Sequence, residues 1–143
     1  MASWSEVEAE APELAARARA LFDAFTHKTM ATLRRDGSPR ISGTEVEYSG
    51  GELFIGSMSR AVKALDLRRD PRFAIHSGSA DPPDWPGDAK IAGRAEEVSK
   101  PGADSHRFRL DISELVVVRL GDPADHLVIE SWHEGRGVSS IRR

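Results

Sequence analysis

The chain has 143 residues, which suits one domain with its own hydrophobic core and is too short for separate cofactor and substrate domains. It contains no cysteine, which excludes disulfides, thiolate-bound zinc, iron–sulfur clusters and a cysteine nucleophile. The net charge of −3 argues against a nucleic-acid binder, and no apolar run is long enough to span a bilayer. The first six residues lack the basic and apolar character of a secretory signal, so we expect a cytoplasmic protein without a membrane partner.

An amphipathic helix packed on the core is predicted over residues 1–26. Apolar residues recur there in a heptad pattern, which is typical of a helix that buries one face. The members of this stripe are Val7, Ala11, Leu14, Ala18, Leu21 and Phe25. Pro12 either lies in the first turn of the helix or breaks it.

From Lys28 onward the apolar pattern changes to the alternation of strands, and the first three strands are expected to form an antiparallel meander. A second helix is predicted over 60–69, and it ends there because Asp70-Pro71 forbids its continuation. Segments 77–87 and 99–110 are expected to be irregular. The predicted strands are 29–33, 40–48, 52–57, 72–76, 88–98, 114–120 and 125–132. A mainly β fold with two helices and about seven antiparallel strands is typical of a small closed barrel.

The segment between the third strand and the second helix predicts an anion site. Gly56, Ser57 and Ser59 are small or hydroxyl residues, and Arg60 and Lys63 fall in the expected first helical turn. Free backbone N–H groups, hydroxyls and cations together suit a phosphate monoester. The same two cations also fit an ordinary solvated helix face, which is the alternative interpretation.

Three segments in this order, Ala31–Pro39, Gly56–Ala64 and Leu67–Arg72, resemble the pyridoxamine-5′-phosphate-oxidase-like family of flavin-binding proteins. The resemblance covers about residues 26–142. It implies an FMN-binding split β-barrel, an antiparallel Greek-key barrel of six to seven strands. It also implies a homodimer with a flavin or deazaflavin in each of two grooves at the dimer interface.

The resemblance implies particular cofactor contacts. Ser57 matches the hydroxyl residue that touches the cofactor phosphate, and Lys63 matches the lysine at the helix start. Val62 stands where many relatives have an arginine, and Arg60 is expected to compensate. Further contacts are implied for Arg40, Ile41, Ser42, Gly43 and Ser59. A glycine inside a strand favours close approach of a flat ring to the backbone, although a bulge fits Gly43 equally well.

The C-terminal residues distinguish this chain from true pyridoxamine phosphate oxidases. Trp132 and Arg142 are similar to the tryptophan and arginine beside the flavin in those enzymes. Between them, Val138 and Ser140 stand where those enzymes hold substrate with arginine and histidine. The resemblance therefore implies that pyridoxamine phosphate is not oxidised.

Other groups of polar residues give weaker signals. Glu45 and Glu47 share one face of a predicted strand, and Glu45 is a candidate on the substrate side, with a solvated carboxylate as the alternative. The five histidines include no pair at i,i+4 spacing and predict no metal site. No Ser-His-Asp signature is present.

The sequence thus predicts an oxidoreductase that uses FMN, or else F420, to move a hydride to or from a small organic molecule. No catalytic side chain is assigned, because the cofactor ring performs such chemistry. A non-catalytic protein that binds or senses flavin, F420 or haem is the second hypothesis. A nucleic-acid module built on the basic residues of 60–72 is the third, and it has no aromatic stacking platform.

Overall fold

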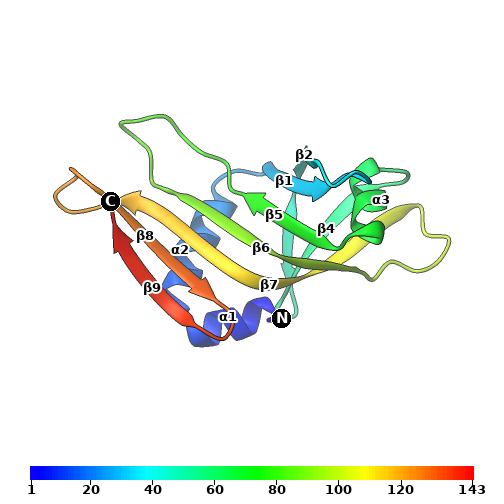
Figure 1. Ribbon diagram of the computed structural model, residues 1–143, viewed down its shortest axis with the longest axis horizontal. Helices are drawn as coiled ribbons and strands as arrows, with labels where there is room; N and C mark the ends of the chain where they lie inside the picture. The colour runs from blue at the N-terminus through cyan, green and yellow to red at the C-terminus, as the bar shows by residue number, and fades with distance from the viewer.

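A computed structural model describes residues 1–143 and shows a mainly β architecture with three helices (Figure 1). The helices are α1 (Trp4–Glu10), α2 (Pro12–Asp23) and α3 (Val62–Arg69). The strands are β1 (Lys28–Leu33), β2 (Pro39–Thr44), β3 (Val46–Ser49), β4 (Glu52–Met58), β5 (Arg72–His76), β6 (Asp88–Glu97), β7 (Ser105–Leu120), β8 (Leu127–His133) and β9 (Gly137–Arg142). None of the helices is long and apolar enough to cross a membrane.

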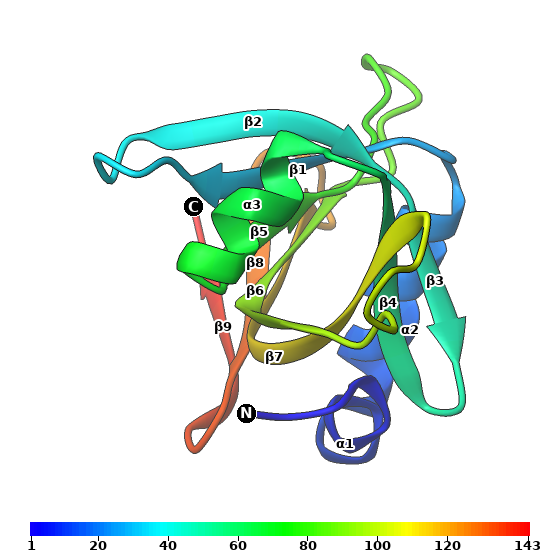
Figure 2. The same ribbon diagram turned by 90° about the vertical axis from the view of Figure 1, so that its right-hand side faces the viewer.

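All strand pairs are antiparallel, and the main path of the sheet runs β2-β1-β5-β6-β7-β4-β3. The two ends of this path, β2 and β3, are consecutive parts of one stretch that bends at Glu45. The sheet therefore curls round until its ends meet, as Figure 2 shows. Long strand β7 pairs with β4 through its first half and with β8 through its second half. The predicted antiparallel barrel is confirmed.

The N-terminal helical region contains two helices where the sequence predicted one. Pro12 is the first residue of α2, and Ala11 before it leaves the helical conformation. A proline supplies no N–H and disfavours helix at the preceding residue, so α1 ends there. The predicted stripe is buried from Val7 to Leu21, and both helices pack against the barrel. Phe25 lies beyond the end of α2 and is 40% exposed.

The strands of the structure differ from the predicted ones at three places. Segment 99–110 is not irregular throughout, because β7 begins at Ser105 and buries Phe108, Leu110 and Ile112 in alternation. The predicted strand 40–48 is two strands separated by the bend at Glu45, so the expected meander is split. β9 was not predicted at all.

Helix α3 begins at Val62, two residues later than predicted. Arg60 precedes the helix in a left-handed conformation with φ of 65°, so it is not part of the first turn. Asp66, which is 2% exposed, anchors α3 to the sheet. Its carboxylate accepts hydrogen bonds from Thr32 Oγ1 at 2.8 Å and from Arg40 Nε at 2.7 Å, on β1 and β2. The α3 helix is thereby held against β1 and β2.

Candidate functional site

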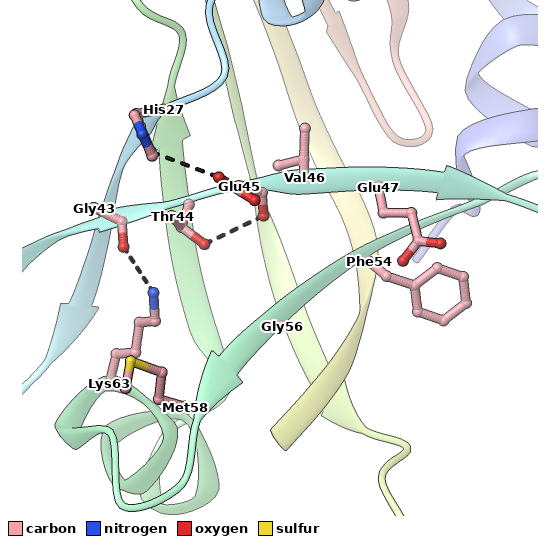
Figure 3. Close-up of a pocket in the computed structure, with 10 residues that line it drawn as sticks. All are labelled: His27, Gly43, Thr44, Glu45, Val46, Glu47, Phe54, Gly56, Met58 and Lys63. Carbon is pink, nitrogen blue, oxygen red and sulfur yellow. Dashed lines mark hydrogen bonds and ion pairs between the residues drawn. The ribbon is translucent and has the colours of Figure 1, made fainter. Parts of the chain in front are cut away.

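A pocket of about 730 Å³ lies between the β2–β3 bend, β4 and the start of α3 (Figure 3). It is lined by His27, Gly43, Thr44, Glu45, Val46, Glu47, Phe54, Gly56, Met58 and Lys63. Eight of these ten residues come from the continuous stretch Gly43–Glu47 and from β4. We call this the β4 pocket.

Lys63 supplies the positive end of the β4 pocket. Its Nζ donates a hydrogen bond to the Gly43 carbonyl oxygen at 2.7 Å, which fixes the ammonium group beside β2. Partial burial lowers the pKa of Lys63 from its usual value. An ammonium group has three N–H donors, so two remain for another acceptor. The site therefore offers an oriented, partly desolvated cation that suits an anionic ligand.

Two glycines, Gly43 and Gly56, form the floor of the pocket, where the backbone carries no side chain. A methyl group built on Gly43 would meet no atom within 4 Å, and one on Gly56 would meet only the His106 carbonyl oxygen, at 3.8 Å. Side chains alternate along β4, so Phe54 and Met58 flank Gly56 on the pocket side. A flat ring can approach such a floor closely, with apolar contacts at its edges.

Acidic and titratable groups lie at the other side of the pocket. His27 Nδ1 is 3.8 Å from Glu45 Oε1, and both side chains are exposed. Glu47 pairs with Arg107 at 3.3 Å, and the Arg107 guanidinium covers the Phe54 ring at 3.9 Å. No three His, Asp or Glu side chains lie close enough to hold a metal ion. The pocket is thus bipolar, with Lys63 on one side and carboxylates on the other.

Of the predicted site residues, the β4 pocket brings together Gly43, Lys63 and the substrate-side candidate Glu45. The hydroxyls of Ser42 and Ser57 are buried and have no hydrogen-bond partner. Ser57 alternates with the pocket residues of β4, so it faces the barrel interior. Ser57 is therefore not among the residues that line the β4 pocket.

Three other predicted residues lie outside the pocket. Ile41 is 72% exposed on the outer face of β2. Ser59 and Arg60 are exposed in the turn between β4 and α3, and neither side chain makes a hydrogen bond. Arg60 is therefore not a helical neighbour of Lys63.

The C-terminal pair does not approach the pocket within this chain. Trp132 is 1% exposed, and its Nε1 donates to Glu10 Oε2 at 2.7 Å, so it fills the core between β8 and α1. Arg142 is the last residue of β9, and its Nη2 is 3.9 Å from Asp125 Oδ1. The C-terminal end of β9 lies at the opposite end of the molecule's long axis from α3 (Figure 1). Within this chain Trp132 is therefore a core residue and does not line the β4 pocket.

Arg40 lies in a second pocket of about 470 Å³, between the β1–β2 turn and α3. We call this the arginine pocket. It is lined by Arg34, Arg35, Asp36, Arg40, Val62, Asp66 and Arg69. Arg40 therefore lies near α3, but it lines the arginine pocket and not the β4 pocket.

The sequence analysis assigned no cofactor or substrate contact to seven residues of the β4 pocket, although one of them, Gly56, belongs to the predicted anion segment. The seven are His27, Thr44, Val46, Glu47, Phe54, Gly56 and Met58. The alternation of apolar residues along 52–58 predicts the positions of three of them, Phe54, Gly56 and Met58. Leu53 and Ile55 are buried, so the even-numbered residues of this strand lie on the opposite face. Nothing local marks His27, which reaches the pocket from the link between α2 and β1.

Comparison with known proteins supports the fold. No family model and no curated protein matches the sequence. Among solved structures, the chain is similar to a pyridoxamine 5′-phosphate oxidase-related, FMN binding protein from Nostoc punctiforme. That match has 15% identity and a TM-score of 0.65, and it covers 100% of this chain and 98% of the other.

Two further solved structures carry different ligand names. A heme binding protein from Mycobacterium smegmatis matches with 16% identity and a TM-score of 0.59, covering 88% of this chain and 86% of the other. A protein named F420 reductase matches with 16% identity and a TM-score of 0.55, and the match covers 68% of this chain and 94% of the other. The resemblance predicted from the sequence is thus confirmed as the split-barrel fold of pyridoxamine 5′-phosphate oxidase-like proteins.

Proposed function

We propose that the β4 pocket binds a phosphate-bearing flavin-type cofactor, FMN or alternatively F420, and that the protein is an oxidoreductase for a small organic molecule. The observation that carries this proposal is the oriented Lys63 ammonium beside the bare floor of Gly43 and Gly56. An anion at the lysine and a planar ring over the glycines match this arrangement. When bound, the cofactor supplies the hydride chemistry.

The residues of the pocket then have distinct roles. Lys63 holds the phosphate, and the glycine backbone leaves space for the ring. Phe54 and Met58 keep water from the edges of the ring. Glu45 lies at the open side, where the substrate enters, and its carboxylate favours substrates that carry hydrogen-bond donors.

A non-catalytic binding protein is the second candidate. The solved structures of this fold include proteins named for FMN, F420 and heme. His27 favours the haem variant specifically, because its imidazole lines the pocket and its side chain is 82% exposed, which leaves it free to ligate iron. This candidate differs from the first in retaining its ligand without turnover.

A titration of the purified protein with FMN, F420 and haemin separates these candidates. Saturable quenching of FMN or F420 fluorescence at one equivalent per chain is the expected result, followed by reduction of the bound ring by a nicotinamide or by a reduced substrate. A Soret shift with haemin alone would favour the second candidate. If none of the three ligands binds saturably, both candidate functions are overturned.

Lys63→Met is expected to weaken FMN binding by about 1.5–3 kcal/mol, the scale of a hydrogen bond to a charged group. Because burial lowers the pKa of Lys63, wild-type affinity should fall as pH rises toward that pKa, earlier than for a free lysine at about 10.4. The variant should lack this alkaline loss. Calorimetry between pH 7 and 10 measures both effects.

Lys100→Met is the matched control, since Lys100 is exposed on the loop between β6 and β7. This variant removes one positive charge at a position outside the pocket, so it should leave both the FMN affinity and its pH dependence unchanged. Equal losses in the two variants would show that only the overall charge matters, and the lysine site would be abandoned.

We also propose a homodimer, because a row of small apolar residues crosses the outer face of β2-β1-β5-β6. Ala31 lies opposite Ile41 and Ala74, and Ala74 lies opposite Ala92, so small residues run across the sheet. Ile41 stands 72% exposed at the edge of this row. Exposed apolar residues that line up across neighbouring strands are typical of an interface.

Ala74→Glu is expected to convert the dimer into monomers, because it places two carboxylates in a two-fold apolar contact. Sedimentation velocity on both proteins measures the change, and circular dichroism verifies that the variant is folded. A wild-type monomer that still binds one cofactor per chain would contradict the dimer.

A further inference from the structure

A groove of about 390 Å³ lies between α1 and α2, on the side of the barrel away from α3 (Figure 1, Figure 2). We call it the helical groove. Its charged residues are Glu8, Arg19 and Asp23, which give it both signs of charge. We propose that the helical groove binds a small α-amino acid, with the carboxylate of the ligand on Arg19 and its ammonium group on the carboxylates of Glu8 and Asp23.

The helical groove is separate from the proposed cofactor pocket. Glu47 lines the β4 pocket, whereas Tyr48, the next residue of β3, packs against Trp4 at the wall of the groove. The centroids of these two rings are 5.2 Å apart. Side chains alternate along a strand, so the two openings lie on opposite faces of β3. Binding in the groove therefore needs no cofactor.

Arg19 is held in position and still has free donors. Its guanidinium carbon lies 4.1 Å from the centroid of the Tyr48 ring, and its Nε is 3.7 Å from Asp23 Oδ2. Its two terminal nitrogens make no hydrogen bond within the chain, and the side chain is 47% exposed. A guanidinium with free terminal nitrogens is well suited to a bidentate contact with a carboxylate. Arg19 therefore supplies the position for the acidic end of the ligand.

Two buried donors at the wall of the groove have no acceptor. Trp4 is 1% exposed, and neither its Nε1 nor the Tyr48 hydroxyl makes a hydrogen bond. Burial raises the pKa of Tyr48, so this hydroxyl keeps its proton. Buried donors are nearly always paired, because an unpaired one costs stability. Together with Arg19, these donors gather round the Tyr48 ring, and a carboxylate is the acceptor with the most lone pairs to offer them.

Two carboxylates are available for an ammonium group. Glu8 lies one turn after Trp4 on the same face of α1, is exposed, and makes no ion pair or hydrogen bond. Asp23 is 60% exposed, and its 3.7 Å contact with Arg19 is too long for a hydrogen bond. Besides burial, the charges of Asp23 and Glu8 raise the pKa of Tyr48, so both carboxylates lie within electrostatic range of this ring. An amine alone would leave the donors unused and an acid alone would leave the carboxylates unused, so a zwitterion fits best.

Small residues of α2 leave room for the side chain of the amino acid. Pro12, Ala16 and Ala20 lie at four-residue spacing and line the groove between its charged groups. The volume of about 390 Å³ is more than ten times the share of one water molecule in the liquid, about 30 Å³. An apolar side chain finds apolar contacts there. L-leucine is therefore a suitable probe.

Titration of the protein with L-leucine, isoamylamine and isocaproate tests the site. Isoamylamine is leucine without the carboxylate, and isocaproate is leucine without the amine. The indole N–H signals of Trp4, Trp85 and Trp132 in NMR spectra report binding, and Trp85→Phe and Trp132→Phe assign them by elimination. We expect leucine to shift the Trp4 signal saturably, and each analogue to bind about tenfold more weakly or less, since each lacks one charged contact.

Two variants separate the ends of the ligand. Arg19→Gln should weaken leucine binding about tenfold and leave isoamylamine binding unchanged, because the amine makes no use of Arg19. Glu8→Gln should weaken leucine binding and leave isocaproate binding unchanged. The matched controls are Arg136→Gln and Glu13→Gln, two exposed residues outside the groove, and both should bind leucine as the wild type does. Circular dichroism verifies that each variant is folded.

Three outcomes would overturn the amino-acid site. They are the absence of a saturable leucine shift at Trp4, equal binding of isoamylamine and leucine, and equal weakening in a groove variant and its control. Repeating the leucine titration with FMN present keeps the two sites distinguishable. If leucine binds and FMN does not, the helical groove stands and the proposed function fails.

Discussion

Gly43→Val is expected to weaken FMN binding by about 5- to 150-fold, or to abolish it, while the barrel stays folded. A Cβ at Gly43 meets no protein atom within 4 Å, and the residue has ordinary strand geometry in β2, so valine costs the free protein little. The added side chain occupies the space above the floor, where the ring is expected to lie. Such overpacking of a bound ligand costs about 1–3 kcal/mol or excludes the ligand altogether.

Ser140→Val is the control for this substitution, because Ser140 is exposed on β9 and lies outside both pockets. Fluorescence titration with FMN and urea unfolding should be run on both variants. Unchanged FMN affinity in folded Gly43→Val would show that the ring does not lie over this floor. Gly56→Ala offers an independent check from the other side of the pocket.

Trp132→Ala is expected to lower the free energy of unfolding by about 3–5 kcal/mol, the usual cost of removing a fully buried tryptophan. The indole is 1% exposed and joins β8 to the end of α1 through Glu10. Trp132→Phe keeps most of the volume and should remain folded, with a smaller loss. Urea unfolding measures both, and FMN affinity of the folded Trp132→Phe protein should equal that of the wild type. Normal stability with reduced affinity would instead assign Trp132 to the cofactor.

Most of the barrel was predictable because its strands alternate cleanly. Segment 88–98 shows this best, since Ala89, Ile91 and Ala95 are buried as the alternation requires. The first part of β7 was missed because Arg107 and Arg109 on its outer face make 99–110 look polar. β9 was missed because it is an edge strand whose Ser139 and Ser140 are exposed, so it has no buried face to detect.

The candidate site was predictable where it depends on backbone and local sequence, as at Gly43 and Lys63. It was not predictable where a residue's role depends on which face of a strand it occupies, because a shift of one residue moves a side chain to the other side of the sheet. Ser57 therefore faces the interior while Gly56 faces the pocket. The arginine pocket was missed for a different reason. Asp66 holds Arg40 and Arg69 in this pocket and is buried. In the sequence it cannot be distinguished from the exposed charged residues of a polar helix.

The most direct test of the cofactor site is a crystal structure of the protein grown with FMN. We expect electron density for the ring over Gly43 and Gly56, between Phe54 and Met58, with the phosphate within hydrogen-bonding distance of Lys63 Nζ. Full-occupancy density for the ring at any other place, with an empty β4 pocket, would contradict the account.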